Sequence, residues 1–166
     1  MNEAIQHRRS IRKYDGKLVE KEKIEKLLRA GMQAPSAANQ QPWEFIVVEN
    51  KETLQKLSNA SIYATPIKNA PLGIVVLVKE ELLKFPSCWQ QDLAAATENI
   101  LLEAVELGLG AVWLGVAPEE DRMAYIKDLF KLPKGVEAFA LLAVGYSSDN
   151  KFEDRFDANR IHYERY

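Results

Sequence analysis

The chain contains four short, strongly apolar runs, and each has the length of a strand. They are EFIVVE at 44–49, LGIVVLV at 72–78, AVWLGV at 111–116 and VEAFALLAVGY at 136–146. Because polar residues are nearly absent from the middle of these runs, the strands are predicted to be covered on both faces. The four runs therefore predict one central sheet.

Segments with helical periodicity lie between these strands. In VEKEKIEKLLRAGMQ at 19–33, apolar positions such as Ile24 and Leu27 mark one face of a helix that ends before Pro35. Further helices are predicted at about 2–7, from an N-cap at Asn50 to about Leu57, and from Pro118 to about 130. Because helices and strands interleave, we expect helices on both faces of the sheet.

The longest predicted helix, CWQQDLAAATENILLEAVELG at 88–108, is apolar nearly all the way round and ends at Gly108. A helix of this kind is usually covered on more than one side. We therefore expect it at the centre of the domain or in a subunit interface.

The C-terminal segment, about 147–166, does not fit the layered pattern. It is highly charged, yet it contains Phe152, Phe156, Ile161, Tyr163 and Tyr166. We interpret it as an arm that packs on a symmetric partner, because so many aromatic side chains need a surface to cover them. A frayed, charged tail is the alternative.

Composition narrows the classes of protein. A length of 166 residues favours a single domain, 1–166, and a net charge of −2 argues against a general nucleic-acid binder. Cys88 is the only cysteine, so the chain alone cannot form a disulfide or a cysteine-ligated zinc or iron–sulfur site. With no apolar run near the length of a membrane span, we expect a cytoplasmic protein that does not enter a membrane.

Cations crowd the stretch RRSIRKY at 8–14. In an extended backbone Arg8, Ser10 and Arg12 share one face, whereas Arg9 and Lys13 share the other. Two guanidinium groups with a hydroxyl between them could bind a phosphate, because arginine pairs with phosphate oxygens in a bidentate manner. A solvated basic turn is the alternative.

Two further segments could contact a ligand. APSAANQQPW at 34–43 places hydroxyl and amide groups between two prolines, which suits the edge of a heterocycle or, equally, a surface loop. Gly115 ends a predicted strand, where a missing side chain allows a flat ligand to approach the backbone, although a plain turn glycine is also possible. GLGAVWLG at 108–115 is not a dinucleotide fingerprint, because a helix precedes it and a strand follows it.

No constellation of catalytic side chains is evident. His7 and His162 lack metal-ligand spacing, and Cys88 is more simply an incidental thiol. Asp92 and Glu98 do not form a convincing acid–base pair. We therefore expect no catalytic side chain and no metal site, and we expect the chemistry to reside in a bound organic cofactor.

Four motifs occur in one order along the chain: RRSIRKY, APSAANQQPWEFIVV, QDLAAATENILLEAVELGLGAVWLG and RIHYERY. Together they resemble the nitroreductase family of FMN-dependent flavoproteins over essentially the whole chain. The resemblance implies an α/β (α+β) fold, a three-layer α-β-α sandwich with a mixed central sheet. It also implies a homodimer with FMN at the subunit interface, in which the C-terminal arms are exchanged.

The resemblance further implies which residues bind FMN. The N-terminal cation stretch would bind the phosphate, the ribityl chain and the pyrimidine edge of FMN. The loop that begins at Pro35 would approach the flavin from the opposite subunit. The backbone around Gly115 would face flavin N5 and O4, and a basic residue of the arm would add a phosphate contact. The implied set is Arg8, Arg9, Ser10, Arg12, Pro35, Ser36, Ala37, Asn39, Leu114, Gly115, Val116 and Arg155.

The implied activity is NAD(P)H-dependent reduction of a small, electron-poor molecule, such as a nitroaromatic or a quinone, in a ping-pong cycle. Alternatives on the same fold are flavin reduction for a partner, reductive dehalogenation and flavin breakdown. A flavin-carrying interaction module without turnover is a further alternative. The chain is short for the family, so the acceptor and the choice between NADH and NADPH are left open.

Overall fold

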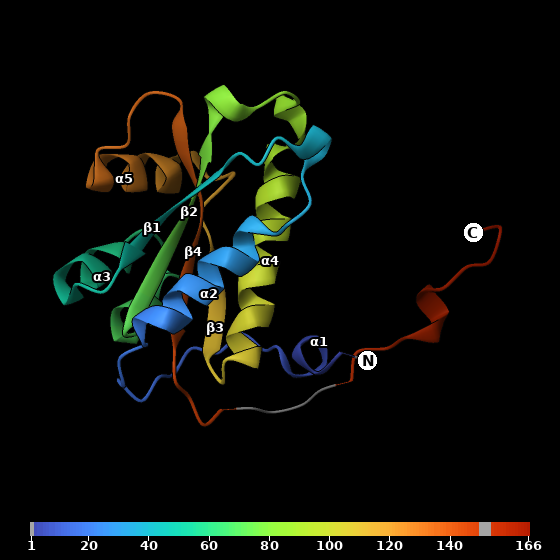
Figure 1. Cartoon of the computed structure of the whole chain (residues 1–166), viewed down its shortest axis with the longest axis horizontal. Coiled ribbons are helices and arrows are strands. Elements are labelled where there is room, and N and C mark those ends of the chain that lie inside the picture. Colours follow the sequence, from blue (N-terminus) through green and yellow to red (C-terminus); the bar gives the residue numbers. More distant parts are fainter. Residues whose placement is uncertain (1, 150–153) are drawn as a thin grey trace.

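The computed structural model describes residues 2–149 and 154–166, and its centre is one four-stranded sheet (Figure 1). The strands are β1 (Trp43–Val48), β2 (Leu72–Lys79), β3 (Gly110–Gly115) and β4 (Val136–Gly145). Their order is β1-β2-β4-β3, and all three pairings are antiparallel. The four predicted strands are confirmed, and β3 lies at one edge of the sheet.

A parallel contact adds to this edge. Ser10 forms an isolated parallel bridge with Ala111, and the Ile11 backbone N–H donates to the Ala111 carbonyl at 2.9 Å. The cation stretch therefore runs in extended conformation along the outer edge of β3. The sheet itself is antiparallel throughout where a mixed sheet was predicted, and the parallel contact is an isolated bridge outside its four strands.

Helices cover both faces of the sheet, as predicted. The α-helices are α1 (Glu3–His7), α2 (Lys21–Met32), α3 (Lys51–Leu57), α4 (Trp89–Glu106) and α5 (Glu120–Phe130). Short 3-10 helices are η1 (Ala37–Asn39), η2 (Thr65–Asn69), η3 (Glu80–Leu82), η4 (Pro86–Cys88) and η5 (Ala158–Arg160). Asn50 caps α3 as expected, whereas α5 begins two residues after Pro118.

The three layers follow from alternation along β2. Ile74 and Val76 pack with α2 and α4 on one face, and Val75 and Leu77 pack with α3 and α5 on the other. Figure 1 shows the two helix layers on opposite sides of the sheet. A Cβ at Gly31 of α2 would lie 2.9 Å from a methyl group of Ile100, so this glycine allows α2 and α4 to approach closely.

Helix α4 packs against the sheet, but its outer side is incompletely covered within one chain. Buried residues include Leu93, Ile100 and Leu101, whereas Leu102 and Val105 are half-buried. No helix among the described residues is both long enough and apolar enough to span a bilayer.

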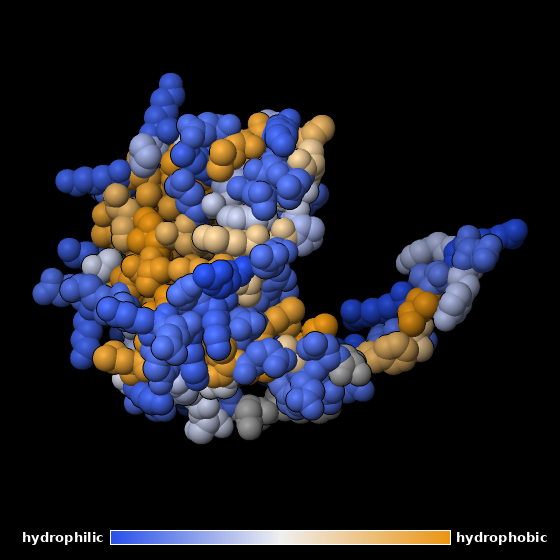
Figure 2. Space-filling view, in the orientation of Figure 1, coloured by the Kyte–Doolittle hydropathy of each residue, from blue (hydrophilic) through white to orange (hydrophobic). Residues whose placement is uncertain are grey.

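The described part of the C-terminal arm, 154–166, extends away from the body (Figure 1). Figure 2 shows apolar side chains along it, separated from the body of the protein. Phe156 is 74 % exposed and Tyr163 is 84 % exposed, so the chain itself does not cover them. Phe152, which was predicted to belong to the same apolar set, lies outside the described residues.

Candidate functional site

The cation stretch is held in a defined place by its uncharged residues. Ile11 is buried, and the Tyr14 hydroxyl lies 2.7 Å from the Ile11 carbonyl and 2.9 Å from the Ala143 carbonyl of β4. Burial raises the pKa of Tyr14, so the phenol remains a hydrogen-bond donor at neutral pH. Ser10 and Arg12, on either side of the buried Ile11, are exposed, as a surface that binds a phosphate requires.

The arginines of this stretch have different surroundings. The Arg8 Nε lies 3.2 Å from the Glu98 carboxyl of α4, and Arg9 donates to the Gln6 carbonyl at 3.0 Å. Burial raises the pKa of Glu98, and the Arg8 guanidinium opposes that shift. Arg12 is exposed and donates to the Ser10 carbonyl at 3.1 Å. Arg8 is thus oriented by an ion pair, while Arg12 is open to solvent.

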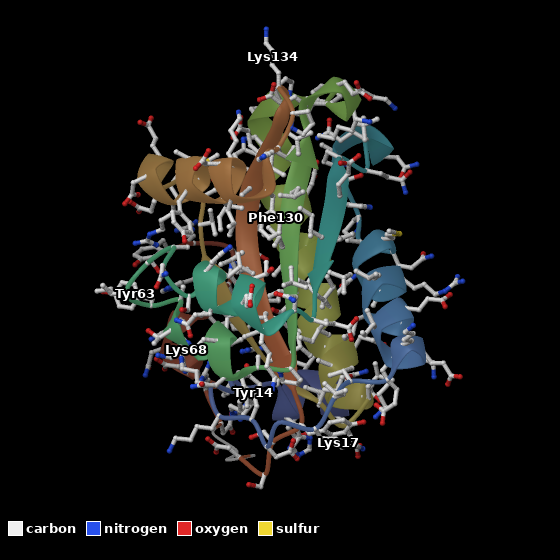
Figure 3. All side chains as sticks on the ribbon, turned by 90° about the vertical axis from the view of Figure 1, so that its left-hand side faces the viewer. Tyr14, Lys17, Tyr63, Lys68, Phe130 and Lys134 are labelled. Carbon is white, nitrogen blue, oxygen red and sulfur yellow. The ribbon has the colours of Figure 1, made fainter. Side chains whose placement is uncertain are left out.

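A groove of about 500 Å³ lies beside Arg12 at the end of β3. Three predicted residues, Arg12, Leu114 and Gly115, form part of its wall. The remainder of the wall was not predicted from the sequence and comes from Ile62, Tyr63, Thr65, Pro66, Trp113 and Arg122. In Figure 3 Tyr63 projects from its loop at the side of the protein, below α5.

The space beside the Gly115 Cα is empty within the chain, so a ligand or another molecule can approach the backbone there. A Cβ built on Gly115 would meet no atom within 4 Å, and its φ is not positive, so neither packing nor backbone conformation requires glycine. Val116 N–H donates to the Phe139 carbonyl at 3.3 Å, and alternation along the antiparallel pair therefore directs the Gly115 N–H and C=O to the open edge. Of the three predicted backbone positions, Gly115 is exposed, whereas Leu114 and Val116 are buried.

The second predicted segment, 35–39, is held at the N-terminal end of α4. Asp92 of α4, only 4 % exposed, accepts a hydrogen bond from the Ala37 backbone N–H at 2.9 Å and another from the Gln40 amide. The Gln40 oxygen accepts from the backbone N–H groups of Lys84 and Phe85 at 2.8 and 2.9 Å. Gln40 therefore fixes the loop from within. The sequence context had suggested that this amide could contact a ligand, but both of its polar atoms are bonded within the chain.

This buried network supports an unusual backbone. Ala38, Asn39 and Gln41 have φ values of 47°, 53° and 47°, which are costly for residues other than glycine. Ser36 also contributes, since its Oγ accepts from the Gln41 backbone N–H at 3.0 Å. The loop is thus held in one conformation with the Asn39 side chain exposed.

The structure does not bring all the predicted residues together within one chain. Loop 35–39 bonds to the first turn of α4 and is absent from the wall of the groove beside Gly115. Arg155 belongs to the arm that extends from the body. Among residues 2–149 and 154–166, no group of three or more His, Cys, Asp or Glu could hold a metal ion.

Comparison with known proteins identifies the family. The model of the Nitroreductase family matches residues 5–88 and 67–146. A protein of Archaeoglobus fulgidus that carries the name NADH dehydrogenase/NAD(P)H nitroreductase is 46 % identical, and the alignment covers 98 % of this chain and 96 % of that protein.

Solved structures agree with this match. A Clostridium acetobutylicum structure named as an NADH oxidase superposes with a TM-score of 0.96 at 59 % identity, covering 98 % of this chain and 99 % of that one. An FMN-dependent nitroreductase from Clostridium difficile gives a TM-score of 0.91 at 35 % identity over the whole of both chains. The chain, with its antiparallel sheet and its cationic strand along β3, therefore belongs to the nitroreductase family.

Proposed function

We propose that this protein is an FMN-dependent oxidoreductase that uses NAD(P)H to reduce a small, electron-poor acceptor. The observation that carries the proposal is the groove in which the open backbone of Gly115 lies beside the exposed guanidinium of Arg12. Family membership and the similarity to an FMN-dependent nitroreductase support the same cofactor.

The cation stretch and the groove together suit the two ends of FMN. The exposed Ser10 hydroxyl and Arg12 guanidinium, with Arg8 of the same stretch, can pair with a phosphate. In the groove, the bare Cα of Gly115 leaves room for a flat ring to approach the strand edge. Arg9 would contribute mainly by fixing the turn, because it donates to the Gln6 and Arg8 carbonyls.

We propose that the complete site forms between two copies of the chain. In this arrangement a symmetric partner supplies Pro35, Ser36, Ala37 and Asn39 to the flavin; the proposal is supported by the absence of loop 35–39, which is hydrogen-bonded to α4, from the groove of its own chain. The half-buried apolar side of α4, which includes Leu102 and Val105, offers a surface on which the two chains can pack. The exposed aromatic side chains of the arm, which also carries Arg155, need a partner surface as well.

In the proposed reaction the protein binds and orients the flavin, and the flavin carries the electrons. Bound FMN would supply a hydride acceptor at N5 that takes two electrons from NAD(P)H and passes them to a nitroaromatic or a quinone. The Gly115 N–H would donate to the ring edge where electron density rises on reduction. The cations at Arg8 and Arg12 would hold the phosphate, and no side chain needs to act as nucleophile or metal ligand. Donor and acceptor would use the same open ring face in turn.

A visible spectrum tests the proposal directly. Purified protein, or protein titrated with FMN, is expected to show the absorbance of bound oxidised flavin, and anaerobic NADH or NADPH should bleach it. Adding a quinone without oxygen should restore the absorbance. A protein that takes up no FMN, or whose bound flavin is bleached by neither nucleotide, would contradict the proposed activity.

Replacing Arg12 with alanine is expected to weaken FMN binding about 10-fold to 100-fold. The exposed guanidinium would lose one charge-assisted contact with the phosphate, which is worth about 1.5–3 kcal/mol. Fluorescence titration of FMN measures the change. Lys13→Ala removes the same charge from the opposite face of the strand and should leave the affinity nearly unchanged. Equal weakening in both variants would indicate a general field effect in place of a phosphate contact.

A further inference from the structure

Arg122 makes a direct contact with the exposed residue Gly115 of the candidate site. It lies in the first turn of α5, and its Nη1 donates to the Gly115 carbonyl at 3.1 Å. This contact closes the turn between β3 and α5. Because Gly115 presents its N–H and C=O to the same open edge, a side chain that holds the carbonyl also fixes the direction of that edge.

Arg122 takes part in none of the ion pairs found in the described part of the chain, although Glu120 and Asp121 lie in the same turn. Asp121 accepts from the Arg122 backbone N–H at 2.9 Å. The residues that line the groove include two arginines, Arg12 and Arg122, and no acid. The lining of this groove therefore carries two positive charges, and Asp121 lines the adjoining groove that shares Arg122.

We propose that Arg122 is a positioning residue that raises the reduction potential of the bound flavin. The inference rests on the proposed function and extends it to a residue that family likeness did not indicate. Reduction by two electrons makes the isoalloxazine more negative, so a fixed cation at its edge stabilises the reduced ring more than the oxidised ring. The guanidinium supplies that cation and, through the Gly115 carbonyl, also holds the backbone that faces the ring.

A purely structural role would have a different signature. If Arg122 served only to close the β3–α5 turn, Arg122→Gln, which keeps a donor for the Gly115 carbonyl, would leave the ratio of the oxidised and reduced FMN affinities unchanged, and any loss would appear in thermal stability. Loss of a redox-tuning charge selectively weakens the reduced form. The ratio of the two dissociation constants is thermodynamically linked to the midpoint potential, so either measurement separates the two roles.

The experiment compares the FMN-loaded wild type with Arg122→Gln and Arg122→Lys. Equilibration with a reference dye during anaerobic reduction gives each midpoint potential, and FMN titrations give the dissociation constants of the oxidised forms. Arg122→Gln keeps a donor but loses the charge, so its potential should shift to a more negative value. The ratio of reduced to oxidised dissociation constants should rise about tenfold, as expected for one lost charge contact near the surface. Arg122→Lys keeps the charge and should restore most of the potential.

A matched control is Arg29→Gln, which removes one positive charge from an exposed position on α2 and should leave the potential unchanged. An unchanged potential in Arg122→Gln, or an equal shift in Arg29→Gln, would overturn the inference while the flavin function still stands. Failure of the wild type to bind FMN would instead overturn the proposed function, and this inference with it.

Discussion

Replacing Gly115 with valine is expected to abolish stable FMN retention without unfolding the protein. The branched side chain would occupy the space through which a flat ring approaches the strand edge, because the chain itself leaves that space empty. Steric overlap typically costs about 1–3 kcal/mol, and a displaced ring would also lose its hydrogen bond to the backbone N–H. Together these losses predict a dissociation constant about 100-fold higher or more.

Two measurements check this result. FMN titration followed by fluorescence gives the affinity, and the thermal midpoint of the flavin-free protein reports on the fold. Valine suits an exposed edge strand, so that midpoint should not fall. A Gly115→Val protein that retains FMN with the affinity of the wild type would remove this glycine from the flavin site.

Gly110, at the other end of β3, provides a matched contrast. A Cβ there would lie 2.7–2.9 Å from three side-chain atoms of Ile11, so this glycine is required by packing within the chain. Gly110→Ala should therefore lower the thermal midpoint of the flavin-free protein. Gly115→Ala should leave that midpoint unchanged and weaken FMN binding less than valine does.

The layered fold could be predicted from the sequence because its signals are local. Continuous apolar runs such as 72–78 mark strands buried on both faces, and the Asn50 side chain caps its helix by accepting from the Thr53 N–H, only three residues away. The strand order was not predictable in the same way. Antiparallel pairing of β2 with β4 joins segments more than fifty residues apart, and no local pattern specifies that choice.

The candidate site was only partly predictable for the same reason. The exposed positions Ser10, Arg12 and Gly115 carry signals in their own residue types, and the structure places the last two in one groove. Arg122 could not be selected from the sequence, because it is one of several charged residues at the start of a helix. Its role becomes visible only from its hydrogen bond to the Gly115 carbonyl. Glu98 likewise gains its role from Arg8, ninety positions earlier.

Asp92 has a structural role that its sequence context does not indicate. The pattern of α4 did not support an acid–base pair of Asp92 and Glu98, and the structure gives each a separate partner. The two oxygens of Asp92 face two donors, the Ala37 N–H and the Gln40 amide, in a site almost closed to solvent. Its task is to hold loop 35–39, a role that requires a contact across 55 residues.

Replacing Asp92 with alanine is expected to lower the free energy of unfolding by about 2–5 kcal/mol. Two buried donors would lose their acceptor, and each unsatisfied group costs about 1–3 kcal/mol. For a chain of this size, the loss corresponds to a fall of about 5–15 °C in thermal midpoint. Asp128→Ala, at an exposed position on α5, is the control and should change the free energy by less than about 0.5 kcal/mol.

A double-mutant cycle with Gln40→Ala separates this network from ordinary loss of packing. Gln40→Ala removes one of the two donors that face Asp92, and it also leaves the Lys84 and Phe85 N–H groups without their side-chain acceptor. If the residues act together, the double variant should be less destabilised than the sum of the two single variants, by about 1 kcal/mol or more. Additive effects would show that Asp92 and Gln40 stabilise the protein independently. Because the positive φ values of Ala38, Asn39 and Gln41 depend on this network, FMN binding should weaken in the same variants if the loop contacts the partner's flavin.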